Sequence, residues 1–339
     1  MAVHPDAGVK SDRKNGLPSN LNYAMMPSFK SVTHVHLLAI INTLVQDAAT
    51  NSAVRVLDLG CGQGDLIAYL HKSLALLRPD IQFQVYGYDV IWGSPETNTG
   101  KANAIAKLQQ EAPGTDWSQR VSFQPPSSPW PFPDAFFDII VSNQVLEHVA
   151  DHAALVAEVK RTLAPGGSSA HLFPLKNYVY EGHIFVPFVH RFENHDLAVA
   201  FLRFMHRLGF GRLDSEGKPS RHGMADAENQ ADWFMRFTNY RFKNEFLSLG
   251  RRAGLRVSFR FTQEFYWAKI RSLLHRAPKY IYSSRRSAIL DWLLFSALKY
   301  VSGITLFLAK PRSAEDAELL LAAPSSVLST DLSLESQLQ

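Results

Sequence analysis

The sequence is poor in cysteine, and Cys61 is the single one among 339 residues. An intramolecular disulfide is therefore excluded. The chain also has no Cys-x-x-Cys pair and no His-Glu-x-x-His motif, which are spacings that would predict a metal site, so we expect no metal ion. Because Cys61 lacks a partnered base, we interpret it as a small packing residue and not as a nucleophile.

Charged residues make up only 19% of the chain and form no long basic block. The net charge of +4 and the pI near 9.0 are mildly basic, but dispersed Lys and Arg residues do not indicate a nucleic-acid-binding surface. Residues 1–31 lack a basic start followed by an apolar core. We therefore predict no secretory signal and a cytoplasmic protein.

Residues 288–309 are apolar over a length that could be mistaken for a membrane span. Asp291 and Lys299 interrupt the stretch and Gly303 breaks it, so we predict a helix followed by a strand and no transmembrane segment. Basic residues just ahead of the stretch leave room for peripheral docking at the inner face of a membrane. These residues are Lys279, Arg285 and Arg286.

A glycine-rich stretch lies between a predicted strand and a predicted helix. Residues 54–59 are short, β-branched and apolar, which is typical of a buried parallel strand, and a helical pattern follows residue 65. The position three after Gly62 is Asp65, so the spacing departs from the Gly-x-Gly-x-x-Gly of a dinucleotide binder. Asp58 and Asp65 flank the turn and suit a cation better than a phosphate. Three glycines at alternate positions let the backbone approach a ligand: Gly60, Gly62 and Gly64.

A second strand-like run, 83–88, ends in Asp89, where an acid can accept hydrogen bonds from both hydroxyls of a ribose. Together with the glycine turn, this pattern resembles the cofactor half of a class I S-adenosylmethionine-dependent methyltransferase (methyltransferase type 11-like). The resemblance covers residues 32–174. It implies an α/β fold with a Rossmann-like, doubly wound sheet of seven strands, mostly parallel with an antiparallel last strand, and a helical and aromatic insertion after the fifth strand.

The resemblance implies S-adenosylmethionine as the cofactor. Asp58 would support the turn or the amino-acid end, Asp89 would hold the ribose, and the polar turn at 143–144 would lie near the transferred methyl group. Pro126 stands where family members usually have an Asp, so backbone groups or Gln124 would hold the adenine. The predicted cofactor contacts are Asp58, Gly60, Cys61, Gly62, Gly64, Asp89, Val90, Gln124, Ser127, Asn143 and Gln144.

Composition and sequence pattern also predict how the chain is divided into regions. At 46% hydrophobic residues it can bury a full core. His34 and His36, in a helix predicted from residue 32, are expected to be partly exposed. We predict a flexible arm (1–31), a cofactor-binding core (32–174), a substrate-side insertion or lid (175–240), a C-terminal part that completes the sheet (241–310) and a disordered tail (311–339).

The insertion is long for a connection and mixes His, Glu and Tyr with many Phe residues, which suits a lid over an active site. A histidine with a pKa near neutrality can take the proton of a hydroxyl acceptor. His183 is the first candidate for this general base and His190 the second, although a histidine without chemistry is an equal alternative. The predicted acceptor contacts are Tyr178, Tyr180, Glu181, Arg191 and His148.

The predicted function is methyl transfer by in-line displacement to a small-molecule, sugar or lipid-linked acceptor, at a hydroxyl oxygen. Two alternatives stay open. One is a non-catalytic S-adenosylmethionine-binding protein of the same fold. The other, disfavoured by the glycine spacing, is a nicotinamide-dependent oxidoreductase.

Overall fold

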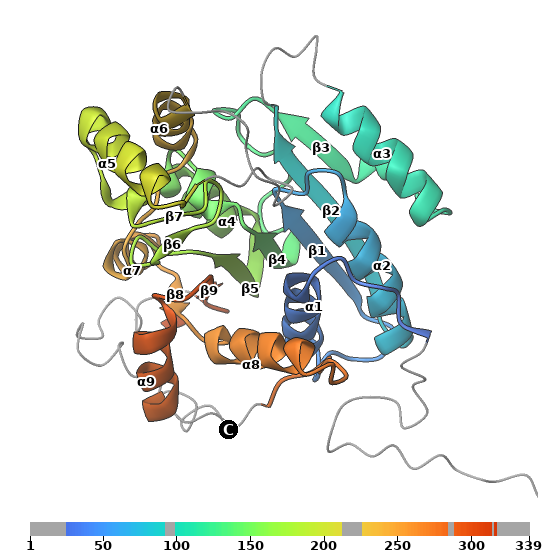
Figure 1. The fold of residues 1–339 in the computed structure, drawn as a ribbon. Coiled ribbons are helices and arrows are strands. Elements are labelled where there is room, and N and C mark those ends of the chain that lie inside the picture. The colour runs from blue at the N-terminus through green and yellow to red at the C-terminus, as the bar shows by residue number, and fades with distance from the viewer. Residues whose placement is uncertain (1–24, 92–98, 212–225, 284–287, 314, 317–339) are drawn as a thin grey trace, which may run out of the picture.

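A seven-stranded sheet forms the centre of the computed structural model, which describes residues 25–91, 99–211, 226–283, 288–313 and 315–316 (Figure 1). The strand order is β3-β2-β1-β4-β5-β9-β8. The strands are β1 (Ala53–Leu59), β2 (Gln82–Val90), β3 (Val121–Gln124), β4 (Phe137–Asn143), β5 (Leu163–Phe173), β8 (Arg256–Ser258) and β9 (Ile304–Ala309).

Strands β1 to β5 pair in parallel, whereas β9 is antiparallel to both of its neighbours, β5 and β8. The predicted Rossmann-like, doubly wound sheet with an antiparallel last strand is therefore confirmed. The central strand β1 is buried on both faces because its side chains alternate between two cores. Val54 and Val56 enter one core, and Leu57 and Leu59 enter the other.

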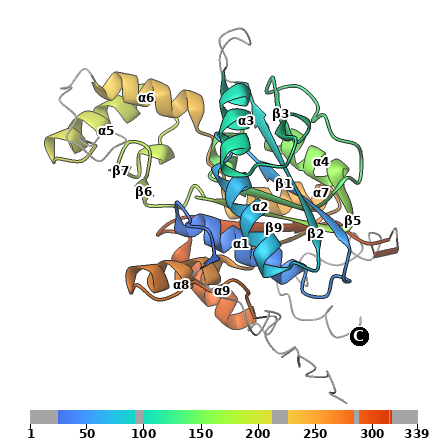
Figure 2. The same cartoon turned by 90° about the vertical axis from the view of Figure 1, so that its right-hand side faces the viewer.

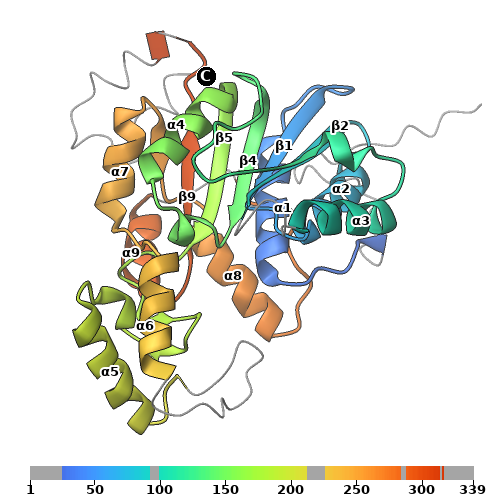
Figure 3. The ribbon, with the colours of Figure 1, turned by 90° about the horizontal axis from the view of Figure 1, so that it is seen from above.

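Helices cover both faces of the sheet (Figure 3). The first core joins the sheet to α1 (Val32–Leu44), α2 (Asp65–Leu77) and α8 (Thr262–Leu273). The second core joins it to α4 (His152–Thr162) and α7 (Lys243–Arg252). Helix α3 (Gly100–Glu111) packs beside β3, and α9 (Ala288–Leu298) packs beside α8.

The insertion after β5 projects from this body (Figure 2). It contains β6 (Tyr180–Glu181), β7 (Val186–Pro187), the short helix η4 (Val189–Arg191), α5 (His195–Arg207) and α6 (Asp226–Phe237). Its apolar side chains form a core separate from the two cores of the sheet, with members such as Val186, Leu202 and Ala231. The predicted helical and aromatic insertion is confirmed, while the domain boundaries at 174/175 and 240/241 remain a prediction.

Three details differ from the sequence-based expectation. The sequence predicts the fifth strand at 169–173, but β5 begins at Leu163, because residues 164–167 bulge out between two paired positions. His34 and His36 are buried, not partly exposed, because His34 packs against Tyr69 of α2, while α8 and the segment after it cover His36. Helix α8 corresponds to none of the elements predicted from the sequence.

The apolar stretch 288–309 is a helix followed by a strand, as predicted. No helix among the described residues has the length and hydropathy needed to cross a membrane. Most of the predicted arm (1–31), nearly all of the predicted tail (311–339), Arg285 and Arg286 lie outside the described residues.

His36 makes stability depend on pH. Its ring nitrogens contact the Tyr282 hydroxyl at 2.8 Å and the Thr305 hydroxyl at 2.9 Å, and burial lowers its pKa from 6.5 to about 3. Below pH 6.5 the His36 imidazole is protonated in the unfolded chain but stays neutral in the folded chain. The free energy of unfolding therefore falls as the pH falls from 6.5 toward 3. Between pH 6.5 and 5, His36 should remove about 2 kcal/mol from the free energy of unfolding.

We expect His36→Gln to reduce the pH-dependent loss by that amount in urea titrations, whatever its effect at pH 7. The control is His195→Gln, because the His195 side chain on α5 is 43% exposed. Equal pH profiles for the wild type and His36→Gln would contradict the prediction.

Candidate cofactor and acceptor site

The glycine turn joins β1 to α2 and is tied to the end of β2. The Gly60 amide donates a hydrogen bond to the Tyr88 carbonyl at 2.8 Å, and the Gly62 amide donates to Asp89 Oδ2 at 2.6 Å. Gly60, Gly62 and Gly64 all have positive φ, at 76°, 50° and 79°, which glycine adopts without strain. The alternate glycines are therefore a requirement of this backbone.

The three glycines differ in what surrounds them. A Cβ on Gly60 would lie 2.3 Å from Val145 Cγ2, and a Cβ on Gly64 would lie 3.0 Å from Leu108 Cδ1. A Cβ on Gly62 would meet nothing within 4 Å. Gly60 and Gly64 thus allow close packing, whereas Gly62 faces a space that a ligand can enter.

Two carboxylates stand beside this space, of which Asp58 is buried and Asp89 is half-buried. Asp58 is 1% exposed, and its Oδ2 has no hydrogen-bond partner among the described residues. Burial, and then the charge of Asp89, raise the pKa of Asp58 well above its usual value. Burial also raises the pKa of Asp89, against the opposing effect of the Gly62 and Val90 amides. Asp65 is ion-paired to Lys30 and Lys107 instead.

This arrangement suits a cation with a nucleoside attached. S-adenosylmethionine carries a sulfonium and an ammonium group, which two clustered carboxylates favour. Its ribose hydroxyls can donate to Asp89, and its amino-acid end can approach Gly62 and the unpartnered Oδ2 of Asp58. The residues present therefore fit the predicted cofactor.

The other predicted cofactor contacts lie at the same edge of the sheet. Val90 pairs with Gln124 at the ends of β2 and β3, and Ser127 is exposed in the turn that follows β3. Cys61 packs beneath the turn, where a Cβ on Gly87 would lie 2.9 Å from its Sγ. Burial, and then the charges of nearby aspartates, raise the pKa of the Cys61 thiol well above 9.0, which agrees with a packing role.

The turn after β4 is strained. Gln144 has a φ of 56°, which is uncommon for a residue other than glycine, and its amide donates to the Leu172 carbonyl at 2.8 Å. The neighbouring Asn143 Oδ1 is buried and has no hydrogen-bond partner among the described residues. Strain and an unsatisfied oxygen at the end of β4 are typical of a ligand site.

A cluster of two histidines and two glutamates begins three residues later. Glu147 and His148 lie in the short helix η3 (Leu146–His148), and His183 and Glu181 come from the insertion. The His148 and His183 rings meet edge to face, with centroids 4.9 Å apart. Ligand atoms of Glu147, His148 and His183 all lie within 4.8 Å of one another. The insertion thus reaches the end of β4.

Glu181 orients His183 and is hydrogen-bonded on both carboxylate oxygens within the chain. It is fully buried, and its Oε1 accepts from His183 Nδ1 at 2.6 Å and from the Tyr240 hydroxyl at 2.7 Å. Its Oε2 accepts from the amides of His183 and Ile184, both at 2.8 Å. Burial alone would raise the pKa of Glu181, but these bonds outweigh it and lower the pKa. Glu181 in turn raises the pKa of His183.

The end of α6 holds η3 from the other side. His148 Nδ1 donates to the Phe237 carbonyl at 2.7 Å, and the Asn239 amide donates to the Glu147 carbonyl at 2.6 Å. The Glu147 carboxylate is 1% exposed, and neither of its oxygens has a hydrogen-bond partner among the described residues. Burial raises the pKa of Glu147 to about 8. Glu147 was absent from the predicted site.

The second predicted base lies deeper. His190 is 4% exposed and stacks with Tyr178 at a centroid distance of 5.9 Å, and burial lowers its pKa. Arg191 donates to the Asn177 carbonyl at 3.0 Å and is exposed, as is Tyr180. The structure therefore brings His148 and His183 together and leaves His190 in the wall of the insertion.

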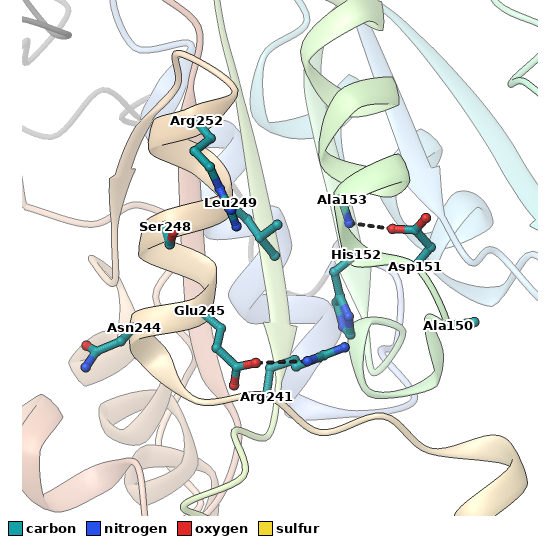
Figure 4. Close-up of a pocket in the computed structure, with 10 residues that line it drawn as sticks. All are labelled: Ala150, Asp151, His152, Ala153, Arg241, Asn244, Glu245, Ser248, Leu249 and Arg252. Atoms are coloured by element: carbon teal, nitrogen blue, oxygen red, sulfur yellow. Dashed lines mark hydrogen bonds and ion pairs between the residues drawn. The ribbon is translucent and has the colours of Figure 1, made fainter.

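A separate hollow lies between the start of α4 and helix α7 (Figure 4). Arg241 and Glu245 form an ion pair across 2.9 Å there, and Asp151 caps α4 by accepting from the Ala153 amide at 2.9 Å. None of the residues that line this hollow belongs to the glycine turn. The chemistry of the site is therefore assigned from the glycine turn and the cluster beside η3.

A parallel sheet with a glycine turn after β1 and an acid at the end of β2 defines a nucleoside-binding α/β protein. Comparison with known proteins narrows this class. A family model described as a methyltransferase domain matches residues 33–217, which is more than half of the chain. The chain therefore belongs to the class I S-adenosylmethionine-dependent methyltransferases, as the sequence predicted.

Several curated relatives are methyltransferases. A ubiquinone/menaquinone biosynthesis C-methyltransferase of Desulfotalea psychrophila is 31% identical over 152 residues, 44% of this chain and 53% of that protein. A trans-aconitate 2-methyltransferase of Azoarcus sp. is 32% identical over 140 residues, 41% of this chain and 44% of that protein. A probable chloroplastic tocopherol O-methyltransferase of rice is 33% identical over 123 residues, 36% of this chain and 29% of that protein.

The chain thus spans about half or less of the length of these relatives. Among solved structures, an S-adenosylmethionine-dependent methyltransferase from Mesorhizobium loti aligns with a TM-score of 0.41 and 17% identity, over 79% of this chain and 95% of that one.

Two alanine substitutions in the turn should destabilise the protein to different extents. Gly62→Ala places a methyl group in the open space, so we expect a loss of roughly 1–2 kcal/mol in stability from positive φ alone and about tenfold or more weaker S-adenosylmethionine binding. Gly60→Ala must also displace Val145, so its loss of stability should be roughly 2–5 kcal/mol.

Thermal unfolding and calorimetric titration with S-adenosylhomocysteine measure both effects. Equal destabilisation by the two substitutions would contradict the packing described for Gly60.

Proposed function

We propose that the protein transfers a methyl group from S-adenosylmethionine to a hydroxyl oxygen of a small-molecule, sugar or lipid-linked acceptor. The observation that carries the proposal is the position of Val145. It packs against Gly60 of the turn that fits the cofactor, and it stands two residues before Glu147 of the cluster. Cofactor and acceptor can therefore meet at the end of β4.

The sulfonium is already a strong methyl donor, so the protein mainly has to align the acceptor, exclude water and remove a proton. His183 is partly exposed and next to His148, which supports the proposal that it acts on the proton of the acceptor, either directly or as a ligand of a bound ion. Tyr178, Tyr180 and Arg191 are proposed to contact the rest of the acceptor.

The curated relatives are named for different acceptors, and one name specifies carbon and another oxygen. The choice of oxygen for this chain therefore depends on the imidazole groups of the cluster, because a hydroxyl must lose a proton when it is methylated. A non-catalytic protein would bind S-adenosylmethionine and methylate nothing, and an oxidoreductase would bind a nicotinamide cofactor instead.

Two variants should separate cofactor binding from chemistry. Asp89→Ala removes the ribose acceptor, so we expect at least about tenfold weaker binding of S-adenosylhomocysteine in calorimetry. His183→Ala should keep that affinity and slow methyl transfer by about a hundredfold, measured with radiolabelled S-adenosylmethionine and a panel of hydroxyl-bearing acceptors.

Unchanged affinity in Asp89→Ala would overturn the cofactor site. Unchanged turnover in His183→Ala would overturn its role at the acceptor, and binding without transfer to any acceptor would favour the non-catalytic alternative.

We also propose that the protein docks on a lipid surface through the α8–α9 face, defined as the exposed apolar side chains of these helices. Trp267 and Trp292 are 59% and 60% exposed, and aliphatic side chains accompany them. Helices α8 and α9 lie side by side (Figures 1 and 2), and the exposed Arg276 and Lys279 follow α8. Apolar and aromatic groups flanked by basic residues favour an anionic lipid surface. A cytoplasmic, membrane-peripheral location follows from this proposal.

Vesicle flotation tests the α8–α9 face. The wild type should float with vesicles that contain phosphatidylserine more than with phosphatidylcholine alone, and the double variant Trp267→Ser/Trp292→Ser should lose most of this binding. Phe204→Ser removes an exposed aromatic group of α5 instead and serves as the matched control. Equal flotation of the double variant and the control would contradict the proposal, as would a wild type that does not float and dimerises through this face.

A further inference from the structure

We propose that Glu147, His148 and His183 bind a divalent transition-metal ion beside the acceptor position. Two imidazole nitrogens and one carboxylate form a known ligand set for Zn²⁺ in catalytic sites and for non-haem iron. The three residues converge from two parts of the chain that are 35 residues apart, and their ligand atoms lie within 4.8 Å of one another. From the sequence we expect no metal ion, because the spacing of these three residues matches no fixed metal-binding motif.

The hydrogen bonds of the two histidines prepare them for a metal. His148 Nδ1 must donate to the Phe237 carbonyl, because a carbonyl oxygen can only accept. His183 Nδ1 donates to the Glu181 carboxylate in the same way. In the neutral form of each ring, Nε2 therefore carries the lone pair. Imidazole held by a backbone carbonyl or a carboxylate on the opposite nitrogen is the usual outer shell of a metal site.

Glu147 supplies the negative charge. A buried carboxylate without partners is costly unless it is protonated, paired or bound to a metal. Neither oxygen of Glu147 has a hydrogen-bond partner among the described residues. By contrast, each oxygen of the nearby Glu181 accepts two hydrogen bonds from the chain. A bound cation would satisfy Glu147, and its backbone is already anchored by Asn239.

The set leaves a coordination position open. His183 is exposed, while Glu147 is buried, so an acceptor can approach from the side of His183. Ligand atoms of one tetrahedral ion lie about 3.3–3.6 Å apart, so the widest pair must close by about 1 Å. A bound ion would lower the pKa of a coordinated hydroxyl. This consequence for methyl transfer depends on the proposed function, but metal binding itself does not.

Another group of histidine and acids gives a matched control. His195 contacts Asp232 at 2.9 Å and Asp196 at 3.5 Å on the surface of the insertion, where the His195 side chain is half-exposed and the two aspartates are largely exposed. This group, like the proposed metal site, contains histidine and acidic side chains, but it has no buried carboxylate. A weak, non-specific interaction of metal with surface groups would therefore involve His195 as much as His183.

The test is metal binding by the full chain after treatment with a chelator. Titration with Zn²⁺ followed by dialysis and elemental analysis should give about one ion per chain, and Co²⁺ should give the visible absorption of a low-symmetry nitrogen and oxygen site. We expect Glu147→Gln and His183→Ala to weaken binding at least about tenfold, Glu181→Gln to weaken it less, and His195→Ala to leave it unchanged.

Circular dichroism verifies that each variant folds, and Zn²⁺ should raise the unfolding temperature of the wild type and of His195→Ala but not of folded His183→Ala. Less than stoichiometric binding by the wild type, or equal affinity of His183→Ala and His195→Ala, would overturn the proposal. Asp89→Ala should lose the cofactor and keep the metal, so the failure of one site is distinguishable from the failure of the other.

Discussion

The contact between Gly60 and Val145 is the constraint on which the arrangement of the site depends. No side chain fits at Gly60, because its Cβ would overlap the Val145 side chain. The backbone of the turn can therefore approach the end of β4 closely. Since Val145 begins the segment that carries Glu147 and His148, this one contact sets the position of the cluster beside η3 relative to the glycine turn.

The site also concentrates buried and half-buried acids, which differ in how many hydrogen bonds the chain donates to them. Asp89 accepts backbone amides from the turn and from its own strand. Glu181 is satisfied by a histidine, a tyrosine and two amides, which keeps it ionised. Asp58 and Glu147 keep oxygens without partners among the described residues. Buried acids of this kind favour cationic ligands, and they are the two that face the proposed cofactor and metal positions.

The cofactor half could be predicted from the sequence because its signals are local. The strand, the alternate glycines and the acid after the next strand lie within 37 residues, at 53–89, and parallel strands bring their ends to one edge. The acceptor cluster could not be predicted, since no spacing encodes the meeting of His148 with His183 or of His148 with the Phe237 carbonyl. These contacts depend on how the insertion packs against the sheet.

Burial of the histidines of α1 was missed for a related reason. Helix α8, which covers His36, has large apolar residues such as Trp267 on its exposed side, so its hydrophobic pattern does not mark the buried face. His36 accordingly finds partners more than 240 residues away, in Tyr282 and Thr305. Long-range contacts of this kind are visible only in the folded chain.

The separate core of the insertion has a consequence for evolution. Its apolar residues pack among themselves, and a hydrogen bond of the Phe237 carbonyl with His148 Nδ1 joins it to the segment after β4. Mutations can therefore accumulate in α5 and α6 without disturbing the strands that hold the cofactor turn. If the insertion contacts the acceptor as proposed, a lineage with this architecture can change the molecule that it modifies by rebuilding the insertion and inherit the donor half intact.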